Sequence, residues 1–234
     1  MKRREYVLGV RRGVPVAMGY FSVSFGFGAM AVSQGITPLA ATLISATNLT
    51  SAGQFAGLTL ILARAGLWEV ILTTIVINSR YALMSLALSQ RMGEKIGLLQ
   101  RLMVAFFNTD EIFALAMAHT EPLSTAFLLG LGTLPFFGWS LGTLSGALAG
   151  SVLPLSIRTA LGVMLYGMFV AIVVPVAARQ NPVLLVSLAA LCLSCFFAWL
   201  PGLTAISPGI AIVVCTVASA ALGAWLCPRE EETE

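Results

Sequence analysis

Long apolar segments follow one another along most of the chain, and short stretches containing charge, glycine or proline separate them. A run of about 18 apolar residues or more is long enough to cross a bilayer as a helix. The segments lie near residues 14–34, 38–63, 67–90, 102–118, 123–153, 157–178, 182–200 and 203–227. The pattern predicts an all-α, polytopic integral membrane protein with about seven or eight transmembrane helices.

Some of these segments are expected to be interrupted helices. Segment 123–153 is longer than the roughly 20 residues that cross a bilayer, and Pro135 and Gly138 are expected to break or kink it. The glycine and hydroxyl residues within 14–64 favour an interrupted or re-entrant helix there.

A faint internal repeat has an offset of 114 residues. Transporters are often built from such repeats, with broken helices at matching positions. Chance in a glycine-rich chain is the alternative, and both stay open. The matching pairs are Gly28 and Gly142, Gly53 and Gly167, and Phe55 and Phe169.

Charge is scarce, and nearly half of it lies at the two ends of the chain. Hydrophobic residues make up 58% and charged residues 10%, against about 25% charged in a soluble domain. We therefore divide the chain into a basic N-terminus (1–12), a single transmembrane transport domain (13–227) and a short acidic C-terminal tail (228–234). The dispersed basic residues give no reason to expect nucleic-acid binding.

The positive-inside rule predicts a cytoplasmic N-terminus, because five of the first twelve residues are basic. The same rule places the loop from Arg91 to Arg101 in the cytoplasm. The three predicted spans between these regions would put that loop outside. The threading of 14–64 is therefore left open.

Cofactor, metal and enzyme sites are not expected. Cys192-x-x-Cys195 has redox or metal spacing, but neither another cysteine pair nor a histidine cluster joins it, since His119 is the only histidine. The stretch "GTLSGALAG" (142–150) approaches the nucleophile pattern of intramembrane serine proteases, but Thr143 stands where their first glycine would be. The absence of a Gly-x-x-x-x-Gly-Lys-Ser/Thr loop excludes ATP-driven transport by this chain itself.

Charged and amide residues inside the apolar segments are the strongest functional signal. Arg80 lies in the middle of 67–90, where an arginine must pair with an acid or meet an anionic ligand. Asp110 and Glu111 are the acids at comparable depth, and a purely structural ion pair is the alternative. Two polar stripes at helical spacing favour either the lining of a pathway or simple helix contacts. They are Thr47, Ser51 and Gln54, and Thr74, Asn78, Tyr81, Ser85 and Ser89.

The chain resembles the AzlC family, the large subunit of bacterial branched-chain amino-acid exporters. The matching stretches, in family order, are "GVPVAMGYFSVSFGFGAMA" (13–31), "SAGQFAG" (51–57), "INSRYALM" (77–84), "FNTDEIFALA" (107–116) and "FGWSLGTLSGALAG" (137–150). The chain departs from the family at Ser22 and Ser24, at Leu49-Thr50-Ser51, and in lacking an aspartate within 157–175. These departures put the usual branched-chain substrate set in doubt.

The resemblance implies a proton-motive-force-driven exporter of leucine, isoleucine, valine or similar amino acids in the bacterial plasma (inner) membrane. It also implies a small, separately encoded membrane subunit of the AzlD type. The alternatives are a carrier for a different small solute and a non-transporting membrane scaffold subunit.

We assign roles to the intramembrane polar residues as hypotheses. Arg80 is expected to meet the substrate carboxylate, and the amides expected to assist it are Asn78, Gln54 and Asn108. Asp110 is expected to pair with Arg80 and Glu111 to carry the proton. Glu111 is expected to share a helical face with Asn108, at i and i+3. Glycines at every fourth position from Gly138 to Gly150 are expected to pack closely against a neighbouring helix, with a small partner chain as one candidate.

Overall fold

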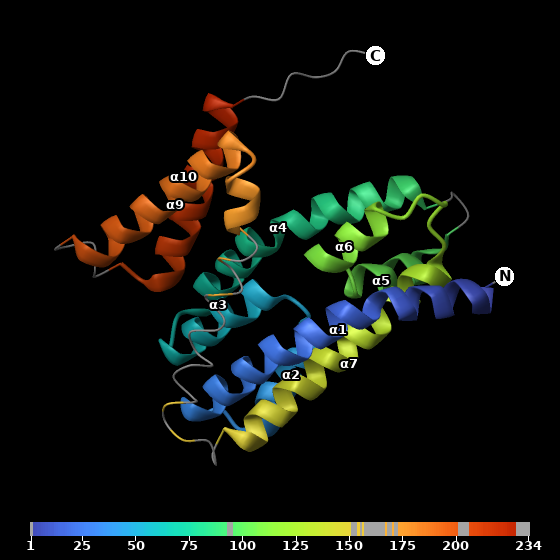
Figure 1. The fold of residues 1–234 in the computed structure, drawn as a ribbon. Coiled ribbons are helices and arrows are strands. Elements are labelled where there is room, and N and C mark those ends of the chain that lie inside the picture. Colours follow the sequence, from blue (N-terminus) through green and yellow to red (C-terminus); the bar gives the residue numbers. More distant parts are fainter. Residues whose placement is uncertain are drawn as a thin grey trace. The chain divides into compact units, whose positions relative to one another are not determined.

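The computed structural model describes residues 2–92, 96–150, 173–200 and 206–227, together with the single positions Pro154, Ser156, Gly167 and Val170. The described chain is helical, which confirms the predicted fold class. The helices are α1 (Lys2–Ser33), α2 (Pro38–Thr47), α3 (Ser51–Leu62), α4 (Leu67–Arg91), α5 (Leu98–Phe106), α6 (Asp110–Met117), α7 (Thr125–Ala149), α9 (Asn181–Trp199) and α10 (Pro208–Leu226) (Figure 1).

Five of the described helices, α1, α4, α7, α9 and α10, are long and apolar enough to cross a membrane. This is fewer than predicted, because segments 38–63 and 102–118 are each divided into two short helices. The predicted span at 157–178 lies largely outside the described residues, as does the acidic tail at 228–234. The basic residues near the N-terminus are part of α1, which begins at Lys2.

The chain forms two compact units. Unit 1 comprises Met1–Gln54 and Asn78–Leu165, and unit 2 comprises Phe55–Ile77 and Tyr166–Glu234. Every intramembrane polar residue singled out above as a ligand or proton carrier belongs to unit 1.

In unit 1, α1 and α7 run side by side in close contact (Figure 1). A Cβ atom on Gly138 would come within 2.5 Å of the Ala17 carbonyl oxygen, and one on Gly146 would overlap the backbone of Phe25. Gly142 and Gly150 approach the next turns of α1 in the same way. The predicted close packing of this glycine stripe is therefore confirmed, and its neighbour is α1 of the same chain.

Of the two places where interrupted helices were expected, one has a break and the other does not. α7 continues through Pro135 and Gly138, so the expected break is wrong. Pro135 is buried against α1, and such packing lets a membrane helix tolerate a proline. Breaks occur at 48–50, between α2 and α3, which confirms the interruption expected within 14–64, and at 107–109, between α5 and α6.

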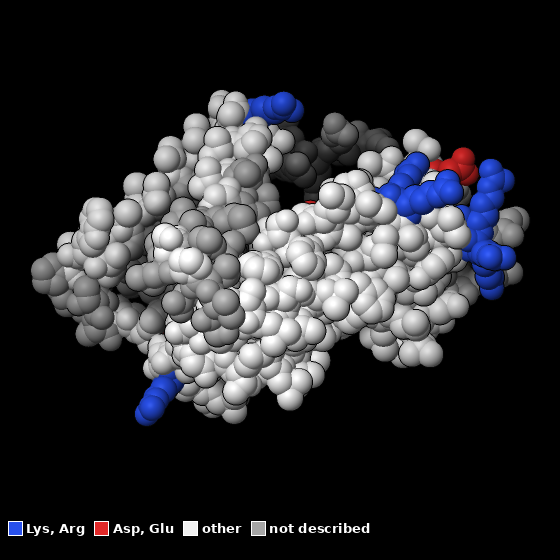
Figure 2. Space-filling model, turned by 60° about the horizontal axis from the view of Figure 1, so that its bottom comes forward, with Lys and Arg blue, Asp and Glu red and all other residues white. Residues whose placement is uncertain are grey.

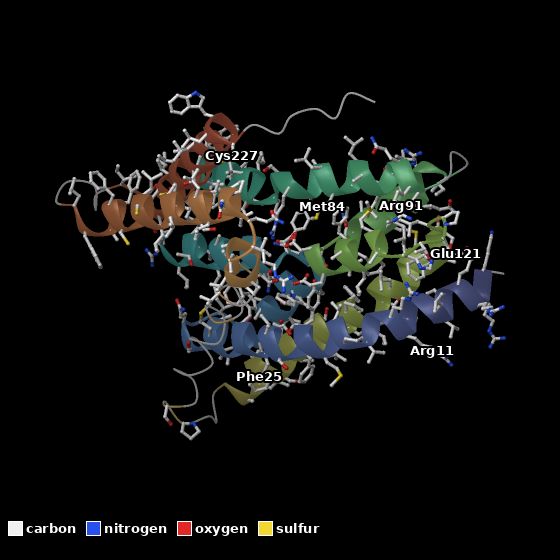
Figure 3. The ribbon with its side chains drawn as sticks, turned by 45° about the horizontal axis from the view of Figure 1, so that its top comes forward. Arg11, Phe25, Met84, Arg91, Glu121 and Cys227 are labelled. Atoms are coloured by element: carbon white, nitrogen blue, oxygen red, sulfur yellow. The ribbon has the colours of Figure 1, made fainter. Side chains whose placement is uncertain are left out.

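One end of unit 1 brings basic residues from three parts of the chain together. Arg12 Nη1 lies 2.9 Å from His119 Nδ1. Arg91, at the end of α4, donates to the carbonyl oxygens of Met117 (2.9 Å) and His119 (2.8 Å). Arg91 and Glu121 lie toward the end at which α1 begins (Figure 3). Basic side chains also gather there on the surface, next to an uncharged face (Figure 2).

These contacts bring the two basic regions of the orientation conflict to the same side of unit 1. The first part of α1 and the turn after Arg91 lie on one side of unit 1. Of the four helices α1 to α4, only α1 and α4 are long enough to cross a membrane. The α5–α6 pair starts after this turn and ends at residues bound by Arg91, so both of its ends lie on that side. Its break at 107–109 is then the tip of a helical hairpin.

In unit 2, α9 and α10 pack against each other, and Val186 lies over Gly223. The Glu69 carboxylate accepts a hydrogen bond of 2.8 Å from the Gly209 amide at the start of α10, where a helix dipole favours negative charge. The four cysteines are free. The proposed repeat stays a prediction, because Phe169 lies outside the described residues.

Candidate functional site

An ion pair joins the middle of α4 to the start of α6. Arg80 Nη1 lies 2.7 Å from Asp110 Oδ2, and the two side chains are 43% and 42% exposed. The pairing predicted from the sequence is therefore confirmed. Asp110 is the first residue of α6, where the helix dipole also stabilises a carboxylate. Because the pair is only half covered, the guanidinium group has N–H donors left for a further anion.

The neighbouring acid has a different environment. Glu111 Oε2 lies 2.5 Å from the hydroxyl of Tyr20 on α1, and the same hydroxyl is 2.6 Å from Thr109 Oγ1. In the part of the chain that the structure describes, Glu111 forms no ion pair, whereas Asp110 does. Adjacent acids thus have separate partners, one a cation and the other a neutral hydroxyl.

Asn108 lies in the tip of the α5–α6 hairpin. It is 5% exposed, and its Nδ2 donates to Ser85 Oγ on α4 over 3.1 Å. Its Oδ1 is buried and has no hydrogen-bond partner among the described residues. The expectation that Asn108 and Glu111 share a helical face is wrong, because Thr109 is extended and α6 begins only at Asp110. The hairpin tip therefore offers a buried acceptor close to both acids in sequence.

Gln54 belongs to a buried hydrogen-bond network. It is 1% exposed, its Nε2 donates to Ser45 Oγ (2.6 Å), and its Oε1 accepts from Trp139 Nε1 (2.9 Å). Ser45 Oγ lies 2.6 Å from Thr143 Oγ1. The Trp139 ring meets the Tyr20 ring edge-on, with centroids 5.2 Å apart. Both ends of the Gln54 amide are thus occupied, and its direct contact with a substrate stays a prediction that requires these bonds to break.

Asn78 lies beside the start of α3. A Cβ atom on Gly53 would meet the Asn78 amide and Thr50 Oγ1, and Asn78 Oδ1 is buried without a partner in the described chain.

Further along the α4 stripe, Ser85 and Ser89 line a cavity of about 30 Å³ together with Arg101. A cavity of this size holds a water molecule when polar groups surround it.

The sequence did not predict Tyr20, Thr109 or Trp139 as part of the site. The available signal was that a tyrosine or tryptophan inside an apolar segment needs a partner for its O–H or N–H group. Among the described residues, no three histidine, cysteine, aspartate or glutamate side chains lie together as a metal site would require.

The model of the AzlC protein family matches residues 15–153, which is more than half of the chain and includes every site residue named above. The chain belongs to the AzlC family. This is a family of branched-chain amino-acid transport, not one of enzymes. The protein is therefore a polytopic membrane protein of that family, located in the inner membrane.

Curated relatives support the assignment. The chain is 29% identical over 174 residues to "Inner membrane protein YgaZ" of Escherichia coli (strain K12), with 71% of each chain covered. It is 31% identical over 169 residues to a membrane protein of Archaeoglobus fulgidus, with 71% of this chain and 74% of the relative covered. A Helicobacter pylori membrane protein is 30% identical over 141 residues. No solved structure matches the fold.

Proposed function

We propose that this AzlC-family protein exports branched-chain or similar hydrophobic amino acids across the inner membrane, driven by protons. The observation that best supports this proposal is the half-exposed Arg80–Asp110 pair, which lies next in sequence to an acid with no ion-pair partner in the described chain. Charge is costly in a membrane and marks ion or substrate pathways. A non-transporting scaffold has no need of it.

Substrate binding is assigned to Arg80. An amino-acid carboxylate approaching the exposed side of the guanidinium group would compete with Asp110 or bind beside it, and an arginine fork fits a carboxylate well. Asn108 Oδ1 is a buried acceptor that suits the substrate ammonium group. The apolar substrate side chain would rest on neighbours such as Phe107 and Met84. Asn78 on α4 and Gln54 at the start of α3 support the site.

Proton coupling is assigned to Glu111, with Asp110 as the permanent partner of Arg80. A carboxyl group held by a neutral hydroxyl has less to keep it ionised than one paired with arginine. It can therefore bind a proton on one side of the membrane and release it on the other. The basic end of unit 1 that contains Arg12 and Arg91 is assigned to the cytoplasm.

A small membrane subunit of the AzlD type is the proposed partner. The family membership supports it, and unit 1 leaves apolar side chains uncovered along α4 and α5. These include Leu83, Leu86, Leu98, Leu99 and Leu102. Lipid or a partner helix would cover them.

Co-expression with the partner is expected to give full transport, whereas full activity of the reconstituted chain alone would refute an obligate partner.

Radiolabelled efflux tests the proposal. Cells with the chain, preloaded with a panel of amino acids, are expected to lose valine, leucine and isoleucine faster than cells without it. The Arg80→Gln chain, expressed to the same level, is the matched control and should not accelerate efflux. Acceleration confined to another class of solute would favour the alternative of a different small-solute carrier. No solute moved, with or without the partner subunit, would favour a scaffold.

A further inference from the structure

The hydroxyl group of Tyr20 lies between two oxygen atoms but has one proton to donate. It is within hydrogen-bond distance of Glu111 Oε2 (2.5 Å) and Thr109 Oγ1 (2.6 Å). Tyr20 is 8% exposed, so these two groups are its main partners. Which of them receives the Tyr20 proton depends on what the other offers.

The two protonation states of Glu111 require opposite hydrogen-bond directions. When Glu111 is ionised it only accepts, so Tyr20 donates to Glu111 and Thr109 donates to Tyr20 Oη. When Glu111 is protonated, its O–H donates to Tyr20 Oη and Tyr20 donates to Thr109 Oγ1. Each of the three groups keeps a partner in both states. Apart from the proton gained or lost by Glu111, only hydroxyl rotations separate the two states.

We propose that Tyr20 and Thr109 form a reversible hydrogen-bond relay that lets Glu111 exist in either protonation state inside the membrane. Tyr20 is a positioning residue, because it acts through Glu111. The relay rests on the proposed proton coupling at Glu111 and adds the device that makes this coupling possible. A buried acid with a fixed one-way hydrogen bond would instead be held in one state.

The packing around Tyr20 keeps its hydroxyl in place. Its ring stands edge-on to Trp139, at an interplanar angle of 72°, and the Trp139 indole is fixed by its bond to Gln54. Thr109 is the N-cap residue of α6, but its side chain makes no capping bond, so its hydroxyl is available to Tyr20. The buried network therefore holds both ends of the relay.

The remaining titratable and charged groups around Glu111 come from two helices. Asp110 lies on the same helix, and α4 supplies Arg80 and Tyr81. Arg80 and Asp110 compensate each other as an ion pair. α7, which packs against α1, has no charged residue between Thr125 and Ala149. The relay is thus the direct hydrogen-bond contact of Glu111 in the described chain.

Two substitutions should shift transport in opposite directions. Tyr20→Phe removes the donor to ionised Glu111, so the pH of half-maximal gradient-driven transport should rise by about one unit. Thr109→Val removes the acceptor that the protonated state needs, so this pH should fall. Tyr6→Phe is the matched control and should cause no shift. Tyr6 is another tyrosine of α1, and its hydroxyl lies 3.0 Å from a threonine hydroxyl, that of Thr133 on α7.

Infrared titration of the purified protein gives a second measurement that needs no transport. The carboxylic-acid C=O band that Glu111→Gln removes should titrate at higher pH in Tyr20→Phe and at lower pH in Thr109→Val. Shifts of the same sign, or none, would overturn the relay while leaving proton-driven transport intact. A wild-type protein whose transport ignores the pH gradient would overturn the proposed coupling, and the relay with it.

Discussion

Arg80 and Asp110 form an ion pair of 2.7 Å between α4, which is long enough to cross a membrane, and the short helix α6. The arginine comes from the middle of α4, and the aspartate is the first residue of α6. The pair thereby fixes the tip of the α5–α6 hairpin, with Asn108 and Glu111, against α4. The residues proposed to bind the substrate and the proton are brought together at this tip.

Replacing Arg80 by glutamine should abolish substrate binding while the protein still folds. A charge-assisted hydrogen bond contributes about 1.5–3 kcal/mol, so affinity should fall roughly 10- to 100-fold or more. Binding of labelled valine to purified protein measures this. Arg64→Gln, in the exposed turn after α3, is the matched control and should bind normally. Unchanged binding by a folded Arg80→Gln protein would assign the arginine to structure.

The ion pair should also appear as coupling in stability. Asp110→Asn leaves Arg80 unpaired, and Arg80→Gln leaves Asp110 unpaired, so each should lower the thermal midpoint in detergent. The double variant has no charge to compensate and should be more stable than the sum of the single effects predicts. Strictly additive effects would mean that the two charges do not stabilise each other.

The sequence predicted this pair because a charge in an apolar segment requires a partner, and few acids were available. It predicted an interruption within 14–64 but neither its position nor the break at 107–109, and the most obvious breaker, Pro135, lies in a continuous helix. The breaks have no proline or glycine but contain Asn48 and Asn108, each followed within two residues by a threonine. The Thr50 hydroxyl donates to Asn48 Oδ1 over 2.7 Å, and such local bonds compete with helix formation.

Tyr20 and Trp139 were missed for a different reason. Aromatic residues in apolar segments usually serve as packing, and their polar atoms show their partners only once the helices are placed. Tyr20 lies 91 residues before Glu111, and Trp139 lies 85 after Gln54. Contacts at these separations depend on how α1 and α7 pack, which no local pattern specifies.

The glycine contacts between α1 and α7 should be intolerant of larger side chains. Gly146→Val would place its side chain on the backbone of Phe25, which cannot move aside, so we expect a loss of about 1–3 kcal/mol or more. Gly19→Ala is the control, since nothing lies within 4 Å of its Cβ position, and should be neutral or slightly stabilising. Thermal unfolding in detergent compares them. Equal tolerance at both positions would contradict the packing.

The N-terminus and the turn after Arg91 should lie on the same side of the membrane. The contacts of Arg12 and Arg91 with residues 117–119 require this, and the positive-inside rule makes that side cytoplasmic. Reporter fusions at the N-terminus and single cysteines placed in the turn, labelled with an impermeant reagent, test both statements. If the N-terminus and the turn lie on opposite sides of the membrane, this prediction is wrong.

Glu111 is proposed to couple transport to protons, while Arg80, paired with Asp110, binds the substrate carboxylate. Proteoliposomes containing the protein and its partner subunit allow two assays, uptake or efflux driven by a pH gradient and valine exchange at equal pH. Glu111→Gln should lose the first and keep the second, because substrate binding does not need the titrating acid. If Glu111→Gln still drives transport from the gradient, Glu111 is not the proton carrier and the account is wrong.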